Sequence, residues 1–331
     1  MLLNSAINKI NQLSSEKKPF FFIFDFELDK PIIYELDNLP RNILIETDLF
    51  SNIDKKYNAQ DLEYFRTTPP RKELFKIAFE NVQKNLHHGN TFLLNLTFPS
   101  EIKTNLSLED IFYKSKARFK IKYLDEFVCF SPEIFIEIKG GEKGSVEGGK
   151  IYSYPMKGTL DAGIPDAENI LLSDEKEMAE HYTIVDLIRN DLSIIAENIQ
   201  VEKFRYVEKI KTNNKILLQT SSKISGDLPF DYHKNLGEII CKLLPAGSVS
   251  GAPKAKTLEI IQENETGKRG YYSGVFGIFD GSNLTSCVMI RYIEKQKDGA
   301  MYFRSGGGIT AQSDMISEYD ELIQKIYVPF I

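Results

Sequence analysis

Short apolar runs separated by tight turns constrain the fold of this chain more than any other feature. The run Gly274–Phe279 is followed at once by Asp280-Gly281-Ser282-Asn283, residue types that favour a turn, and then by the run Ser286–Ile293. A connection this short joins neighbouring strands that run in opposite directions, so the sequence predicts antiparallel pairing. Further strands are predicted at Phe20–Phe26, Ile32–Tyr34, Thr91–Phe98, Phe127–Phe130, Ile134–Ile138, Lys215–Gln219 and Met301–Arg304.

Helical periodicity accompanies these strands. Between Glu73 and Leu86, apolar residues recur at intervals of three and four, which is typical of an amphipathic helix, and His88-Gly89-Asn90 is expected to end it. Similar patterns predict helices at Asp174–Ile188, Lys254–Asn264 and Met315–Ile326. This arrangement favours an α+β fold with large antiparallel sheets and helices outside, rather than a repeated βαβ array.

Composition excludes several classes of protein. The 331 residues include 41 Lys and Arg against 47 Asp and Glu, and a net charge of −6 argues against a nucleic-acid binder, which needs a basic face. Cys129, Cys241 and Cys287 lie too far apart in the sequence for a disulfide framework or a CxxC metal motif. No window has the roughly 20 apolar residues of a membrane span, and the N-terminus lacks a signal-peptide pattern. A soluble, cytoplasmic protein is expected, with no membrane partner.

A polar stretch divides the chain. Residues 54–71 are rich in Lys, Asp and Gln and end close to Pro69-Pro70, which interrupts regular structure. We therefore expect a short N-terminal segment, residues 1–70, followed by one integrated domain, residues 71–331.

Lys157 is the first candidate for chemistry. It lies in Pro155-Met156-Lys157-Gly158-Thr159, where proline restricts the backbone on one side and glycine frees it on the other. A lysine held in a partly buried cleft can lose its proton and act as a base or nucleophile. On these five residues alone, a surface turn with a solvated lysine is the simpler interpretation.

Two pairs of glutamates have a spacing that suits metal ligands on helices. Glu177 and Glu180 are three residues apart in one predicted helix, and Glu318 and Glu321 have the same spacing in another. Residues at i and i+3 project from one face, so both pairs could face a shared cleft and bind Mg²⁺, which prefers oxygen ligands. Glutamate pairs on helices are also common on solvated faces, and the spacing alone does not separate these interpretations.

Two glycine-rich segments accompany these acids. Gly306, Gly307 and Gly308 follow a predicted strand, and three glycines let a backbone approach a ligand and offer N–H groups to an anion. A flexible hairpin turn is the alternative. Residues 244–253 (LPAGSVSGAP) lack the spacing of a nucleotide-binding P-loop. We interpret them as a shaping loop before a helix that starts near Pro253.

Taken together and in order, these segments resemble the chorismate-utilising enzymes. That family includes component I of anthranilate synthase, component I of aminodeoxychorismate synthase, and the isochorismate and salicylate synthases. Each matching segment is short, but seven occur in register from about Gly89 to Lys325. They are SPEIF at 131–135, PMKGT at 155–159, EMAEHYTIVDLIRND at 177–191, LLPAGSVSGAPK at 243–254, RGYYSGVFG at 269–277, MIR at 289–291, and SGGGIT with EYDELIQK.

The resemblance implies a fold and an activity. The fold would be large antiparallel sheets packed face to face, with helices outside. Within the family, Lys157 followed by Gly158-Thr159 is similar to component I of aminodeoxychorismate synthase, because anthranilate synthases have a small residue at the lysine position. Isochorismate and salicylate synthases use a lysine to activate water but usually lack the Gly-Thr pair. Anthranilate synthase, isochorismate or salicylate synthase and a non-catalytic binding protein of the same fold are the alternatives.

The resemblance also implies roles for individual residues. Lys157 would attack C2 of chorismate while Glu133 protonates the departing C4 hydroxyl. Glu180 and Glu321 would hold Mg²⁺ with Glu177 and Glu318 behind them, directly or through water. The residues implied in substrate binding are Thr159, Arg291, Gly306, Gly307, Gly308 and Lys325.

Two departures from the family pattern affect these expectations. Gln219 occupies a position where many members have histidine, so it is expected to hydrogen-bond the substrate without carrying a proton. The N-terminal part is short, and the Cys-His-Glu set of a glutaminase is missing. Ammonia would therefore come from solution or from a separate glutamine amidotransferase subunit.

Overall fold

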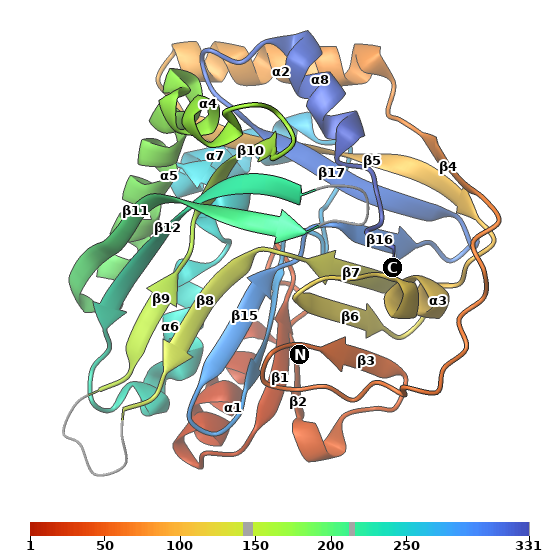
Figure 1. Cartoon of the computed structure of the whole chain (residues 1–331). Helices are drawn as coiled ribbons and strands as arrows, with labels where there is room; N and C mark the ends of the chain where they lie inside the picture. The colour runs from red at the N-terminus through yellow and green to blue at the C-terminus, as the bar shows by residue number, and fades with distance from the viewer. Residues whose placement is uncertain (142–147, 212–215, 331) are drawn as a thin grey trace.

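The computed structural model describes residues 1–141, 148–211 and 216–330, and the strands within them form two antiparallel sheets (Figure 1). In the first sheet, β11 pairs along one side of β12, and β9 and β10 lie one after the other along its other side. The remaining strands follow in the order β8, β15, β14, β1 and β2. The bounds are β1 Phe20–Phe24, β2 Ile32–Glu35, β8 Ile134–Lys139, β9 Lys150–Ser153, β10 Met156–Asp161, β11 Glu197–Lys211, β12 Ile216–Asp227, β14 Val275–Phe279 and β15 Leu284–Val288.

The second sheet has the order β13, β5, β17, β16, β7, β6 and β3, and β4 also pairs with β5. Its strands are β3 Ile43–Glu46, β4 Phe65–Thr68, β5 Leu93–Thr104, β6 Phe119–Tyr123, β7 Phe127–Ser131, β13 Gly251–Ala252, β16 Tyr292–Lys295 and β17 Met301–Ile309. The α-helices are α1 Leu3–Ser15, α2 Lys72–His87, α3 Leu108–Lys114, α4 Ala167–Ser173, α5 Glu175–Ser193, α6 Leu236–Leu243, α7 Lys254–Asn264 and α8 Met315–Gln324. The described residues also form short 3-10 helices, η1 Leu36–Asn38, η2 Tyr232–Asn235 and η3 Gly247–Val249.

Strand β1 shows how the layers pack. All five of its residues, FFFIF, are buried, because side chains alternate between two apolar faces. Phe20, Phe22 and Phe24 pack in a cluster with residues of α1, α5 and α6. Phe21 and Ile23 point the other way, into an apolar layer shared with β3, β6 and β7 of the second sheet. The two sheets therefore pack face to face.

Helices cover the outer face of the second sheet as well. Apolar residues of α2, α7 and α8 pack on β5 and β17, and those of α3 pack on β7 and β16. Figure 1 shows α2 and α8 along one end of the molecule and α1 at the other. The resulting order of layers is helix, sheet, sheet, helix, which confirms the expected fold class.

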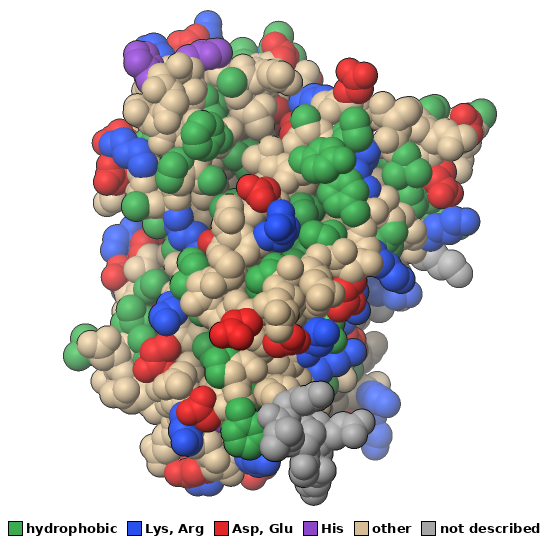
Figure 2. Space-filling model, turned by 90° about the vertical axis from the view of Figure 1, so that its left-hand side faces the viewer, with side chains coloured by type: hydrophobic (Ala, Val, Ile, Leu, Met, Phe, Trp, Pro, Cys, Tyr) green, Lys and Arg blue, Asp and Glu red, His purple; other side chains and the backbone are tan. Residues whose placement is uncertain are grey.

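Figure 2 looks onto the side that carries α4, α5 and β11. Hydrophobic side chains are intermixed there with charged ones, and Ile170, Tyr182 and Phe204 are exposed. Tyr182 and Phe204 contact each other, with ring centres 4.7 Å apart. Among the described residues, no helix has the length and apolar character required to cross a membrane.

The predicted elements are reproduced with some corrections. Helix α7 has the predicted bounds, Lys254–Asn264. The predicted strand Ser286–Ile293 is wrong, because the chain leaves the first sheet after β15 and enters the second at β16. Lys215, the predicted start of β12, lies outside the described residues.

Two segments expected to be irregular contain strand. The glycines 306–308 continue β17 instead of forming a turn, because each is paired with a residue of β5. The stretch 54–71 includes β4, which pairs with the far end of β5. Residues 1–70 thus add β1 and β2 to the first sheet and β3 and β4 to the second.

Candidate active site

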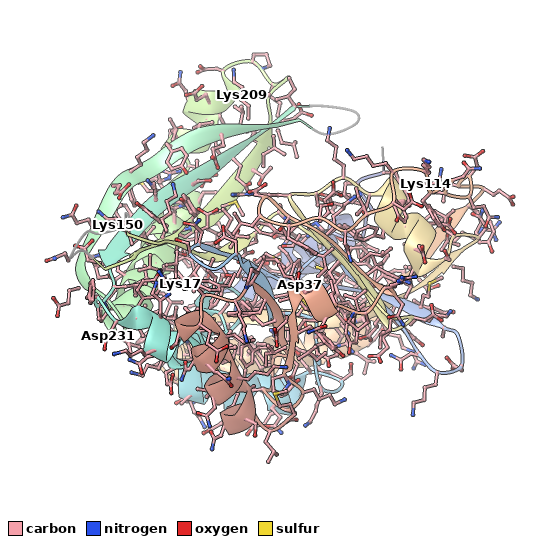
Figure 3. The ribbon with its side chains drawn as sticks, turned by 90° about the horizontal axis from the view of Figure 1, so that it is seen from below. Lys17, Asp37, Lys114, Lys150, Lys209 and Asp231 are labelled. Atoms are coloured by element: carbon pink, nitrogen blue, oxygen red, sulfur yellow. The ribbon has the colours of Figure 1, made fainter. Side chains whose placement is uncertain are left out.

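A cavity of 1740 Å³ lies among β10, β12, α5, η3, β17 and α8. The view from below (Figure 3) shows Lys209 on β11 and Lys114 at the end of α3 in separate parts of the molecule. Lys209 and Lys116 both line the cavity. The residues predicted from the sequence also line it, except for Gly307.

The backbone around Lys157 directs this side chain into the cavity. Pairing between β10 and β12 shifts register between Lys157 and Thr159, and Gly158 has a φ of +75°, which favours glycine. The Thr220 hydroxyl donates to the Lys157 carbonyl oxygen and fixes the strand beside this bulge. Lys157 Nζ lies 3.0 Å from Glu180 Oε2 on α5, and a Cβ at Gly308 would lie 3.3 Å from Nζ. The glycine on β17 therefore leaves room for the lysine head group.

Burial and the ion pair with Glu180 shift the pKa of Lys157 in opposite directions. Desolvation lowers the pKa of the Lys157 amine, but the Glu180 carboxylate, with Glu177 and Glu321 further away, outweighs it and raises the pKa. Lys157 is accordingly an ammonium ion in the resting protein. It must leave Glu180 and lose a proton before it can act as a nucleophile.

The two acidic pairs project from helices that are capped in the same way. Asp174 accepts a hydrogen bond from the Glu177 amide at the start of α5, and Asp314 accepts from Ile316 and Ser317 at the start of α8. The i, i+3 spacing then puts Glu177 and Glu180 on one face of α5, and Glu318 and Glu321 on one face of α8.

Among the described residues, each of these two helices has one of the two glutamates in an ion pair and the other in none. Glu180 pairs with Lys157, and Glu321 pairs with Lys325 at 2.7 Å. Burial raises the pKa of Glu177, and the Glu180 carboxylate adds to that effect. Burial likewise raises the pKa of Glu318, whereas Lys325 overcomes the burial of Glu321 and lowers its pKa.

The four glutamates suit a hard divalent cation. One glutamate of each pair lies beside a glycine: a Cβ at Gly158 would lie 3.2 Å from Glu177 Oε2, and one at Gly307 would lie 3.4 Å from Glu318 Oε2. A cation would relieve the repulsion between these carboxylates. Within the described ranges, however, no three His, Cys, Asp or Glu side chains are close enough together to hold a metal. Metal binding would thus require the glutamates to turn away from the lysines.

Glu133 lies in the same cavity, in the loop between β7 and β8. Its amide donates to Ser131 Oγ at 3.1 Å, its carbonyl oxygen accepts from the Val288 amide at 3.1 Å, and its carboxylate accepts from the Ser248 hydroxyl. Burial raises the pKa of Glu133, and the Ser248 hydrogen bond and nearby cations reduce the shift without cancelling it. A raised pKa suits a general acid at neutral pH.

Strand β17 supplies backbone donors beside these groups. Its pairing with β16 ends at Arg304, so in the part of the chain that the structure describes Gly306–Gly308 are paired with β5 alone and leave one edge open. The amides of Asn95 and Thr97 donate to Ser250 O and Glu265 Oε1, away from β17. By the alternation of an antiparallel pair, Gly306 and Gly308 therefore direct their N–H groups to the open edge.

Two cations stand beside that edge. Lys325 Nζ donates to Gly306 O at 2.9 Å. Arg291 follows β15 with a φ of +54°, a conformation that is strained for arginine, and its guanidinium lies over the Tyr327 ring at 5.0 Å. The open edge, Lys325 and Arg291 together can bind an organic carboxylate.

Gln219 on β12 and Thr159 on β10 are paired with each other, just beyond Lys157 along β10. They contact each other, with Gln219 Nε2 3.5 Å from Thr159 Oγ1. Within the described residues, neither hydrogen-bonds to Lys157, Glu133 or the four glutamates.

The structure adds residues that the sequence did not single out. Ser248, Thr220 and Tyr327 contact Glu133, Lys157 and Arg291 respectively. Of these three, Ser248 has a sequence signal, because it lies in the loop 244–253, for which the sequence predicts a shaping role.

Comparison with known proteins gives a consistent result. The model of the chorismate binding enzyme family matches residues 41–330. An uncharacterized PabA-like protein of Pasteurella multocida is 48% identical over 99% of both chains. Component 1 of anthranilate synthase from Acetivibrio thermocellus is 38% identical, over 81% of this chain and 54% of its own length. Component 1 of aminodeoxychorismate synthase from Bacillus subtilis is 29% identical, over 78% of this chain and 55% of its own.

Solved structures show the same fold. Anthranilate synthase component I from Streptococcus pneumoniae has a TM-score of 0.65 at 27% identity, covering 82% of this chain and 60% of its own. The menaquinone-specific isochorismate synthase of Escherichia coli has a TM-score of 0.73 at 17% identity, and the match covers 98% of this chain and 81% of that protein.

Proposed function

Because this chain belongs to the chorismate binding enzyme family, we propose that it acts as component I of an aminodeoxychorismate synthase. It would convert chorismate and ammonia into 4-amino-4-deoxychorismate, a precursor of para-aminobenzoate and folate. The observation that carries the proposal is Lys157, a lysine aimed into the same cavity as the protonatable Glu133.

In the first step, Lys157 forms a bond to the substrate. Its free amine attacks C2, the two ring double bonds of chorismate each shift by one position towards C4, and the C4–O bond breaks. Glu133 gives its proton to the departing hydroxyl, which leaves as water. The new C2–N group then loses a proton, which returns Glu133 to its acid form.

In the second step, ammonia replaces the lysine. The ammonia nitrogen bonds to C4, both ring double bonds shift back, and the C2–N bond breaks. Glu133 protonates Lys157 as it leaves, and the added nitrogen releases a proton. The nitrogen would come from a separate glutamine amidotransferase, a partner that the PabA-like name of the Pasteurella relative suggests.

The remaining groups would hold the substrate. Arg291, Lys325 and the open edge of β17 would bind its carboxylates, with Thr159 and Gln219 on the far wall. Glu180 and Glu321, with Glu177 and Glu318, would hold Mg²⁺, which would neutralise carboxylate charge when bound.

Anthranilate synthase is the second candidate. It is favoured by the 38% identity to the Acetivibrio protein, which exceeds the 29% identity to the Bacillus aminodeoxychorismate synthase component. The two reactions differ in product, since anthranilate formation also releases pyruvate. The need for a lysine nucleophile, which Lys157 meets, favours the first candidate.

To test both candidate activities, the protein is incubated with chorismate, Mg²⁺ and ammonium, and the products are separated by chromatography. We expect 4-amino-4-deoxychorismate from the wild type, and a loss on the order of 10³-fold or more in Lys157→Ala. Without ammonium, the peptide that contains Lys157 should gain the mass of chorismate less one water. Lys209→Ala, which removes another lysine of the cavity wall, should retain activity. Anthranilate as the product, or a wild-type rate in Lys157→Ala, would refute the proposal.

A further inference from the structure

The loop 244–253 has a fixed shape that the proposed function does not use. Its turn is closed by the amides of Val249 and Ser250, which both donate to the Ala246 carbonyl, at 3.2 and 3.1 Å. The Ser250 hydroxyl donates to the same oxygen at 2.8 Å. A compact turn with this many internal bonds holds its side chains in defined positions.

Groups from outside the loop hold it in place. Arg269 Nη1 donates to Val249 O at 2.6 Å, and the Asn95 amide donates to Ser250 O at 2.9 Å. Lys254 Nζ bridges Leu243 O at 3.0 Å and Asp191 Oδ2 at 3.1 Å. The loop is thus tied to β5, to α5 and to the segment before β14.

One side chain of this loop meets the acid of the active site. The Ser248 hydroxyl donates to Glu133 Oε1, and both residues line the cavity. Within the described residues, this is the only hydrogen bond made by the Ser248 side chain, and it is also the only one made by the Glu133 carboxylate. The contact is between two side chains that are 115 residues apart in the chain.

We propose that Ser248 is a positioning residue for Glu133: its hydroxyl holds Oε1, so that Oε2 carries the proton delivered to the leaving hydroxyl. This rests on the role given to Glu133 in the proposed function. The loop, whose sequence only suggested a shaping role, thereby supports proton transfer.

The electrostatics agree with this geometry. Burial is the largest influence on Glu133 and raises its pKa; the Ser248 hydrogen bond is the next largest and lowers it. The other charged groups that act on Glu133 are Lys157 from β10, Arg291 before β16 and Lys325 after α8, and all three lower the pKa. Loss of the Ser248 hydroxyl should therefore raise the pKa of Glu133 further.

A carboxyl titration tests the proposal without turnover. The protein would be labelled with ¹³C at the Glu carboxyl, and Glu133→Gln would assign the Glu133 resonance. We expect Ser248→Ala to raise the Glu133 midpoint and Ser248→Thr, which keeps the hydroxyl, to leave it near the wild-type value. Ser250→Ala removes a hydroxyl from the same loop without touching Glu133 and should leave the midpoint unchanged. Ser248→Cys, a weak donor of similar size, should raise it and serves if Ser248→Ala does not fold.

Kinetics provide a second readout. The acid must be protonated to act, so the rate falls as pH rises through the Glu133 pKa. In Ser248→Ala, the alkaline limb of kcat for chorismate consumption should move to higher pH, with kcat about 10-fold lower and KM little changed. An unchanged Glu133 midpoint in both Ser248→Ala and Ser248→Cys would overturn the proposal. A wild-type rate in Lys157→Ala would instead refute the proposed function, and the titration would still decide the role of Ser248.

Discussion

Arg269 and Arg291 both lie over an aromatic ring near the cavity, yet their donors are used differently. Arg269 is 1% exposed and lies 4.3 Å from the centre of the Phe26 ring. It donates to both oxygens of Glu265 and to the carbonyls of Val249 and Asn95, at 2.6 to 2.9 Å. All three nitrogens of this guanidinium thus donate hydrogen bonds within the protein.

Arg291 is the opposite case. Its guanidinium lies over Tyr327 and lines the cavity, and within the described residues it makes no hydrogen bond. Its backbone is held at a φ of +54°. The comparison indicates that an arginine whose guanidinium donors all have hydrogen-bond partners supports the fold. An arginine in a cavity whose donors lack partners is available to bind a ligand. Three substitutions test that distinction.

Arg269→Leu should have the largest effect on stability. It leaves Glu265 buried without its partner and removes donors from two carbonyl groups, so the free energy of unfolding should fall by about 3–5 kcal/mol. Urea-induced unfolding followed by circular dichroism measures this. The double variant Arg269→Leu/Glu265→Leu should recover part of the loss. A single variant within about 1 kcal/mol of the wild type would show that the pair is not structural.

Arg291→Leu should affect binding and leave the fold intact. The loss of charged hydrogen bonds to a carboxylate costs about 1.5–3 kcal/mol, which is a weakening of chorismate binding by roughly 10- to 150-fold. The free energy of unfolding should change by less than about 1 kcal/mol, because the described structure gives this guanidinium no hydrogen-bond partner. Calorimetric titration with chorismate and Mg²⁺ gives the affinity. An affinity equal to that of the wild type would remove Arg291 from the binding site.

Tyr327→Ala should have the smallest effect. A ring beneath an exposed guanidinium contributes about 0.5–1 kcal/mol, so chorismate affinity should fall by roughly 2- to 5-fold. Tyr327→Phe keeps the ring and should bind as the wild type does. Equal weakening in both variants would mean that the hydroxyl, rather than the ring, supports the site.

Elements defined by local periodicity could be predicted from the sequence. Helix α7 was predicted with its observed bounds, and α2 extends the predicted Glu73–Leu86 by one residue at each end. In both, the spacing of apolar residues reports directly on the buried face. Strand β11 was missed, because its fifteen residues are rich in charge and pair only with β12.

Features fixed by distant partners could not be predicted. Nothing local in the run Ser286–Ile293 shows that its two halves belong to different sheets. The strand at Gly306–Gly308 is explained only by β5: a Cβ at Gly306 would lie 2.5 Å from Thr97 Cγ2 and 2.6 Å from Leu96 O. The local sequence made Lys157 a candidate and the resemblance to a family gave its role and added Glu133, whereas the contact of Ser248 with Glu133 depends on how the loop 244–253 folds back.

The position of β1 between β14 and β2 has a consequence for biosynthesis. Phe20 pairs with Phe279, so the ribosome must synthesise roughly 260 further residues before the β14 partner of this strand is complete. At typical rates of translation this takes about 13 to 52 seconds. During that time the segment FFFIF has no β14 partner, and an apolar segment of high strand propensity is prone to aggregate. The nascent chain should therefore depend on chaperones until the ribosome has passed residue 279, and truncation before β14 should yield insoluble protein.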